Sequence, residues 1–266
     1  MNTHILDDFI VKPDTSRLTW LNALIISAMS LLSYFVILAL CTYFISFKMA
    51  ETYAITYKIT DINELTKLIK PEVILYSDII SLLFEAIVLI ALSLFLIKKD
   101  LFKTDKYNSA WVLGNLSDIL YGAGYGIIAL LIVCVLNMNS LFNLPLQSDE
   151  ELSRLTDIYN NKGIYFTAIS NFILFSISSP TEELLFRGIL LGGLSKLMKL
   201  PVAILISSVL FALIHFPYDN SLEILLYLSL AFLAIWLRLK SKAIGPAIAM
   251  HITYNYGVLI VNLARI

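Results

Sequence analysis

Two adjacent acids and an arginine lie in the stretch Ser179-Pro-Thr-Glu182-Glu183-Leu-Leu-Phe-Arg187-Gly188, and the sequence on either side is strongly apolar. A charged side chain at the centre of a membrane helix costs about 2.5–3.5 kcal/mol on insertion scales. Three ionisable groups within six residues therefore need partners inside the protein. Because such groups usually mark functional sites in membrane proteins, the stretch predicts a site built between membrane helices.

The composition of the whole chain is that of a membrane protein. The 266 residues are 59% hydrophobic and 15% charged, and the mean hydropathy is +0.82. A typical soluble chain is about 45–50% apolar and about 25% charged. We therefore expect an all-α, polytopic bundle of transmembrane helices, which makes a multi-pass protein of the cell membrane in contact with the lipid bilayer. The net charge of −1 gives no indication of nucleic-acid binding.

The apolar runs predict about eight helices, since a membrane span needs roughly 17–25 apolar residues. The expected ranges are 22–47, 73–97, 116–136, 163–178, 181–199, 201–215, 221–239 and 243–263. Pro180 separates the fourth from the fifth, because the residue before a proline avoids helical angles, and Thr181 is expected to cap the fifth. One helix over 163–199 would be about 55 Å long in a hydrocarbon core of about 30 Å, so we prefer two helices. Merging them would leave seven.

We expect one integral membrane domain made of two parts. Residues 1–162 would form N-terminal membrane helices and interfacial segments, and residues 163–266 a core that contains the ionisable stretch. Asp61-Ile-Asn-Glu64 and Ser148-Asp-Glu-Glu151 look like helix starts and predict interfacial helices, with docking of a membrane-protein partner as the alternative. Gly122 and Gly126 have the spacing that lets membrane helices approach closely.

The charged residues of this stretch lie on two different faces of the expected helix. Glu183 and Arg187 are four residues apart on one helix face and are expected to form an ion pair. Glu182 is rotated by about 100° from Glu183 and lies on a different face. Two further polar clusters follow, Phe211-Ala-Leu-Ile-His215 in the sixth helix and His251-Ile-Thr-Tyr-Asn255 in the eighth.

Helix rise predicts where these side chains lie relative to the turn near residue 200. Glu182 is about 27 Å from that face, His215 about 21 Å, Asn255 about 18 Å and His251 about 12 Å. Glu182, His215 and Asn255 therefore lie at a similar depth in the membrane, and His251 is offset from them by about two helical turns. We therefore expect the four side chains to converge on one site.

Such a set suits the hydrolysis of a peptide bond. A carboxylate and an imidazole can together activate water, and a second imidazole and a carboxamide can donate hydrogen bonds to an oxyanion. Alternatively, Glu182, His215 and His251 match the two histidines and one carboxylate of a catalytic zinc site. Zinc is the only cofactor that the residues suggest.

The three clusters resemble the signature motifs of the CPBP family of intramembrane proteases, which contains type II CAAX prenyl endopeptidases and bacterial Abi and bacteriocin-processing or self-immunity proteins. The family pattern is Glu-Glu-x-x-x-Arg, Phe-x-x-x-His and His-x-x-x-Asn. Here it is complete as Glu182-Glu183-x-x-x-Arg187, Phe211-x-x-x-His215 and His251-x-x-x-Asn255, and the resemblance covers roughly 163–263.

The resemblance implies that residues 163–266 are the catalytic core, and it implies a role for each motif residue. Glu182 and His215 would activate the water, and His251 and Asn255 would hold the oxyanion. Arg187 would pair with an acid in the site, most simply Glu183. The family was named as metalloproteases, but the arrangement also supports a metal-free mechanism. We favour the metal-free version because the helix geometry offers Glu182 no evident set of partner ligands.

The substrate would be a peptide or a segment of a membrane protein, and no prenyl-binding motif is evident. Two other functions remain. One is a non-catalytic scaffold, regulatory or bacteriocin-immunity protein that binds a partner through its membrane helices. The other is a proton-coupled transporter, since glutamate, histidine and arginine in membranes also form proton relays. A transporter predicts broken helices in both halves of the chain, whereas the polar cluster lies in the second half.

Overall fold

A computed structural model describes residues 17–92, 112–138, 149–215 and 221–265, and these residues form helices joined by short connections, with no strand among them. The all-α prediction is therefore confirmed. The elements are α2 (Arg17–Tyr57), α3 (Ile62–Leu92), α4 (Leu116–Met138), α5 (Asp149–Glu183), the π-helix η3 (Leu184–Leu190), α6 (Leu191–Leu197), α7 (Leu200–Leu213), α8 (Ser221–Ser241) and α9 (Gly245–Leu263).

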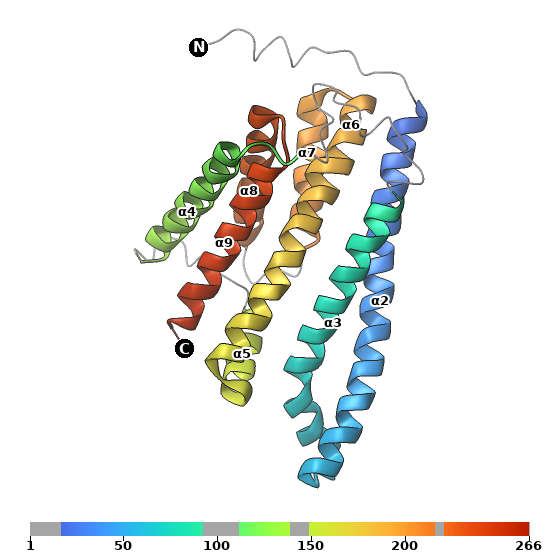
Figure 1. Ribbon diagram of the computed structural model, residues 1–266, viewed down its shortest axis with the longest axis vertical. Helices are drawn as coiled ribbons and strands as arrows, with labels where there is room; N and C mark the ends of the chain where they lie inside the picture. Colours follow the sequence, from blue (N-terminus) through green and yellow to red (C-terminus); the bar gives the residue numbers. More distant parts are fainter. Residues whose placement is uncertain (1–16, 93–111, 139–148, 216–220, 266) are drawn as a thin grey trace.

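The helices form two groups on either side of α5 (Figure 1). Helices α2 and α3 form a hairpin, and α4, α8 and α9 gather on the opposite side. Helix α5 contacts α3 on one flank and α9 on the other, and η3 and α6 continue it toward α7. The motif that begins with Glu182 therefore lies in the middle of the bundle.

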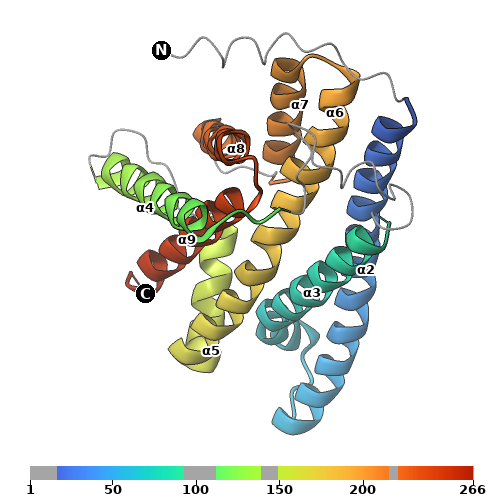
Figure 2. The ribbon, with the colours of Figure 1, turned by 45° about the horizontal axis from the view of Figure 1, so that its top comes forward.

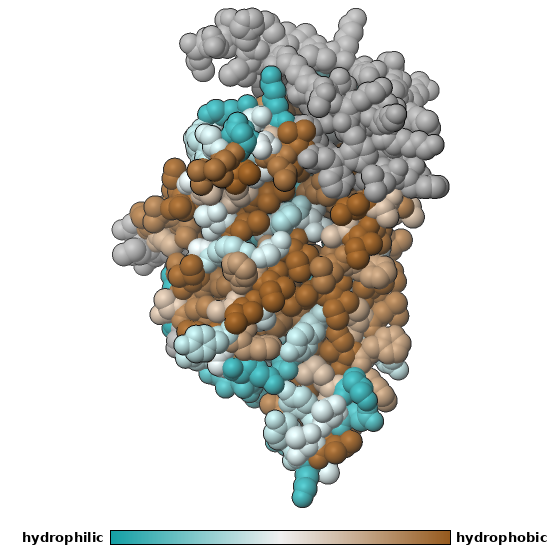
Figure 3. Space-filling view, in the orientation of Figure 1, coloured by the Kyte–Doolittle hydropathy of each residue, from teal (hydrophilic) through white to brown (hydrophobic). Residues whose placement is uncertain are grey.

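Within the described residues, four segments are long and apolar enough to cross a membrane, namely Leu24–Tyr57, Ile62–Leu92, Leu116–Leu136 and Glu223–Ser241. Hydrophobic residues cover the middle of the face drawn in Figure 3, and hydrophilic residues gather toward its lower end. Large side chains on α2, such as Phe35, Phe44 and Phe47, are more than half exposed. Water would penalise such a surface, whereas lipid would not. The fold is that of a helical membrane protein.

The predicted helix break at Pro180 is wrong. Helix α5 runs through Pro180 to Glu183 and continues into η3 and α6, so the merged arrangement is the one observed. Thr181 is not an N-cap, because its Oγ1 donates a hydrogen bond to the Ile177 carbonyl at 2.8 Å, as a threonine inside a helix does. Neighbouring helices and nearby hydroxyl groups make proline tolerable in membrane helices. The local break lies instead at Gly163, whose φ of 81° suits glycine.

One of the two predicted interfacial helices is not separate. Asp61 does begin a helix, since its Oδ1 accepts a hydrogen bond from the Asn63 N–H at 2.8 Å. That helix continues past Pro71 to Leu92, however, and is α3 itself. The helix that starts at Asp149 is short and ends at the Gly163 kink, as expected. Its position at the membrane surface, and the division of the chain near residue 162, stay predictions.

Helix α9, which carries the last motif, is held by close packing against α4. A Cβ atom on Gly122 would lie 2.1 Å from the Pro246 carbonyl oxygen, and one on Gly126 would lie 2.5 Å from that of Met250. No side chain fits at either position. The Gly122–Gly126 spacing therefore works as predicted, and it fixes the position of the helix beside α5.

Candidate active site

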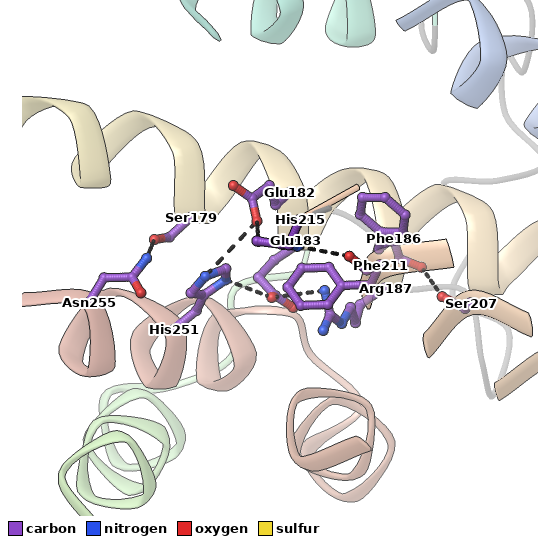
Figure 4. A network of polar contacts seen from close by, with 10 residues as sticks. All are labelled: Ser179, Glu182, Glu183, Phe186, Arg187, Ser207, Phe211, His215, His251 and Asn255. Carbon is purple, nitrogen blue, oxygen red and sulfur yellow. Dashed lines mark hydrogen bonds and ion pairs between the residues drawn. The ribbon is translucent and has the colours of Figure 1, made fainter. Parts of the chain in front are cut away.

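Glu182 on α5 lies close to two histidines that come from other parts of the chain (Figure 4). Glu182 Oε2 lies 3.8 Å from Nε2 of His215, which follows the end of α7, and 4.0 Å from Nε2 of His251 on α9. These distances are too long for direct hydrogen bonds and suit a bridging water. The predicted convergence is present, but the predicted two-turn offset of His251 is wrong. That offset assumed parallel helices, whereas Figure 2 shows α9 inclined to α5.

Glu183 forms a buried network behind these groups. Its Oε1 lies 3.1 Å from Arg187 Nη1 and 2.9 Å from His251 Nδ1, and the side chains of Glu183 and Arg187 are each only 1% exposed. The ion pair expected from the four-residue spacing is therefore present. The contact with His251 was not expected, because spacing along one helix says nothing about a partner on another.

Phe211 connects the arginine to the first histidine. The Arg187 guanidinium carbon lies 3.9 Å from the centroid of the Phe211 ring, a cation–π contact in a buried setting. The Phe211 carbonyl oxygen lies 2.8 Å from His215 Nδ1, and the His215 ring also stacks on Tyr227 with centroids 4.2 Å apart. Phe211 and Tyr227 therefore fix the orientation of the His215 imidazole.

These contacts determine which ring nitrogens carry hydrogen. A carbonyl oxygen can only accept, so His215 Nδ1 donates to Phe211. An ionised Glu183 paired with Arg187 also only accepts, so His251 Nδ1 donates to it. In the neutral rings both Nε2 atoms are then acceptors beside the Glu182 carboxylate. Such a group of acceptors suits a donor such as water between them.

A short π-helix follows the two acids. In η3 the Leu191 N–H bonds to the Phe186 carbonyl, five residues earlier. Ser207 Oγ on α7 donates to the same carbonyl at 3.0 Å. Segments of π-helix are rare and frequently occur at functional sites. Here the extra bond ties the helix that carries Glu182 and Arg187 to α7, which leads to His215.

Asn255 has a partner that the sequence did not indicate. Its Nδ2 donates to Ser179 Oγ at 3.1 Å, one turn before Glu182 on α5. A carboxamide has two N–H groups, so the second is available for another acceptor. Ser179 thus orients Asn255 at the edge of the site.

The site opens into a cavity of about 240 Å³. One wall carries Glu182, His215, His251 and Asn255, and a second includes Tyr34, Asp78 and Arg154 from α2, α3 and the start of α5. Asp78 and Arg154 form a partly buried ion pair at 2.9 Å. Sequence reasoning missed these residues, although an aspartate in the apolar run of α3 is the kind of signal that could have indicated them.

The residues do not have the spacing of a zinc site. Zinc binds imidazole nitrogen and carboxylate oxygen at about 2.0–2.2 Å, so two tetrahedral ligands lie about 3.3–3.6 Å apart. Glu182 Oε2 is 3.8 and 4.0 Å from the two imidazoles. No group of three His, Cys, Asp or Glu side chains in the described ranges could hold a metal ion. The residues present therefore do not fit a zinc ion.

Residues 164–257 match the family model described as "Type II CAAX prenyl endopeptidase Rce1-like". That segment contains all three motifs, whereas the Tyr34, Asp78 and Arg154 wall lies outside it. Neither the curated proteins nor the solved structures gave a match.

Proposed function

With residues 164–257 identified as a domain of the CPBP family of intramembrane proteases, we propose that this protein is an endopeptidase of the cell membrane that hydrolyses a peptide bond with water activated by Glu182 and His215. The family supports CAAX-type protease activity in general. The substrate we propose is a peptide or a segment of a membrane protein.

One observation carries the proposal, namely the position of Glu182 between two imidazoles at 3.8 and 4.0 Å. A water molecule between them donates one proton to Glu182 or to His215 as its oxygen attacks the carbonyl carbon. A C–O bond forms and the carbonyl π-bond becomes an oxyanion. When the tetrahedral intermediate collapses, the C–N bond breaks and the amine leaves with the proton that the base had taken.

Asn255 and His251 would stabilise the oxyanion. Asn255 has a second N–H beyond the one that bonds to Ser179. His251 can donate from Nε2 only as an imidazolium, since its Nδ1 already faces Glu183. Glu183 at 2.9 Å would stabilise that positive charge. Donors placed in advance around the developing charge lower the barrier.

A comparison of membranes that contain either the native protein or Glu182→Ala tests the function and identifies the substrate together. We expect new peptide termini only with the native protein, at equal amounts of the two proteins in the membrane. Identical termini in both would contradict the proposal. Full biological function in Glu182→Gln would favour the alternative that the protein acts by binding a partner.

A further inference from the structure

A second, much smaller cavity lies behind His251. Its volume is about 10 Å³, and it is lined by Glu183, Arg187, Phe211, Leu230, Met250, His251 and Tyr254. About one water molecule fits in a cavity of this size when two to four polar groups are available to bind it. Tyr254 and His251 also line the main cavity, so both belong to the partition between the two.

Three of the lining residues carry buried polar atoms that have no hydrogen-bond partner among the described residues. These atoms are Glu183 Oε2, Arg187 Nε and Nη1, and the hydroxyl oxygen of Tyr254. Of these, Nη1 still lies within ion-pair distance of Glu183 Oε1. Tyr254 is only 5% exposed, and the other two residues are 1% exposed. A buried polar atom without a partner costs about 1–3 kcal/mol. Because all three residues line one small cavity, we infer that these atoms share a partner there.

We propose that this cavity binds one water molecule, which joins the Tyr254 hydroxyl to Glu183 and Arg187. The three groups are chemically complementary to water. The guanidinium donates, the carboxylate accepts, and the phenol can do either. A water molecule has two donors and two acceptors and satisfies all of them at once. A nonpolar molecule would satisfy none, and a cation would be repelled by Arg187.

The bound water makes Tyr254 a positioning residue for His251. Glu183 Oε1 holds His251 Nδ1 at 2.9 Å and Arg187 Nη1 at 3.1 Å, and the water fixes the other carboxylate oxygen. Without it, the Glu183 carboxylate is held at one end only, and the orientation of the imidazole is less well fixed. Tyr254 thereby acts on the site from behind, through Glu183.

The variant Tyr254→Phe distinguishes a hydroxyl that bonds to the cavity water from a buried hydroxyl that has no partner. These two alternatives predict opposite changes in thermal stability. If the water is bound, it loses a partner in the variant, and the melting temperature falls by roughly 2–4 °C. If the hydroxyl has no partner, its removal leaves stability unchanged or raises it. Tyr256→Phe on the same helix is the reference for the loss of one hydroxyl hydrogen bond, because the Tyr256 hydroxyl bonds to Ser176 away from both cavities. A bound water predicts falls of similar size in the two variants.

Kinetics give a second readout, which rests on the proposed function. We expect Tyr254→Phe to lower kcat by about 2- to 10-fold, with KM unchanged, and Tyr256→Phe to leave both unchanged. A raised KM with unchanged stability would overturn the proposal, because it would mean that the hydroxyl contacts the substrate in the main cavity.

An experimental structure of the native protein that shows ordered water is the direct test, and it does not depend on catalysis. We expect one density peak within hydrogen-bond distance of Tyr254, Glu183 and Arg187, and none at that place in Tyr254→Phe. A direct bond between the Tyr254 hydroxyl and another protein group, with no peak in the cavity, would overturn the proposal. If the native protein hydrolyses no peptide, the proposed function fails while the structural and stability results still decide the water site.

Discussion

The Glu183 carboxylate lies 2.9 Å from Nδ1 of His251, on a helix that is far away in the sequence. The same oxygen lies 3.1 Å from Arg187 Nη1. One acid thus joins the first motif to the third, while its neighbour Glu182 points at the Nε2 atoms of both histidines (Figure 4). The two adjacent glutamates therefore have different tasks.

The matched pair Glu182→Gln and Glu183→Gln tests this division of tasks. Glu183→Gln leaves the buried Arg187 charge without a counter-charge, and removing one partner of a buried pair costs about 3–5 kcal/mol. We expect this variant to lose both thermal stability and activity. Glu182→Gln should lose activity at nearly native stability. Melting curves of the purified proteins check the difference, and equal stability of the two variants would contradict it.

Asn255→Ala should reduce kcat by about 10²–10³-fold, the usual cost of removing one oxyanion donor. Ser179→Ala is the control, because Ser179 only orients Asn255, and we expect a loss of less than about tenfold. Both are checked by kcat and KM for one peptide substrate. If the serine variant lost as much as the asparagine variant, Ser179 would have a direct role in catalysis.

Gly122→Ala should lower thermal stability, because its Cβ would lie 2.1 Å from the Pro246 carbonyl oxygen and push α4 away from α9. Gly124→Ala is the matched control on the same helix, since no atom lies within 4 Å of its added Cβ. There the change should be neutral or stabilising by up to about 1 kcal/mol, as alanine favours helix. Thermal unfolding of the two variants in detergent measures the contrast. Similar losses in both would show that the α4–α9 contact is looser than described.

Removing the Asp78–Arg154 ion pair should affect stability non-additively. Each single change, Asp78→Asn or Arg154→Gln, leaves a partly buried charge without its partner, and the double variant removes both charges. We expect a coupling of about 0.5–3 kcal/mol in the double-mutant cycle. If the losses in the free energy of unfolding were simply additive, the contact between Asp78 and Arg154 would contribute nothing to stability.

The contact within one helix could be predicted from the sequence, and the contacts between helices could not. The Glu183–Arg187 pair was predictable because both residues lie on one helix face. The contact of Glu183 with His251, and that of Asn255 with Ser179, join different helices, and no spacing rule reaches them. The rule that ended a helix before Pro180 failed because surrounding helices override a local preference in a membrane protein.

Some residues that line the main cavity could not be predicted from the sequence either. Asp78 and Arg154 come from α3 and from the start of α5, outside the part of the chain that resembles the protease family. Asp78 stands alone in an apolar run, whereas Arg154 lies among other charged residues, and only the fold brings the two within 2.9 Å.

The central claim is that Glu182 activates the water that hydrolyses the peptide bond. The most direct test is kcat/KM for the peptide bond identified from membranes, measured with the native protein and with Glu182→Gln in the same lipid vesicles. Loss of a general base costs about 10²–10⁴-fold, so we predict a drop in that range for a variant that melts as the native protein does. A folded Glu182→Gln protein that cleaves at the native rate would contradict the claim.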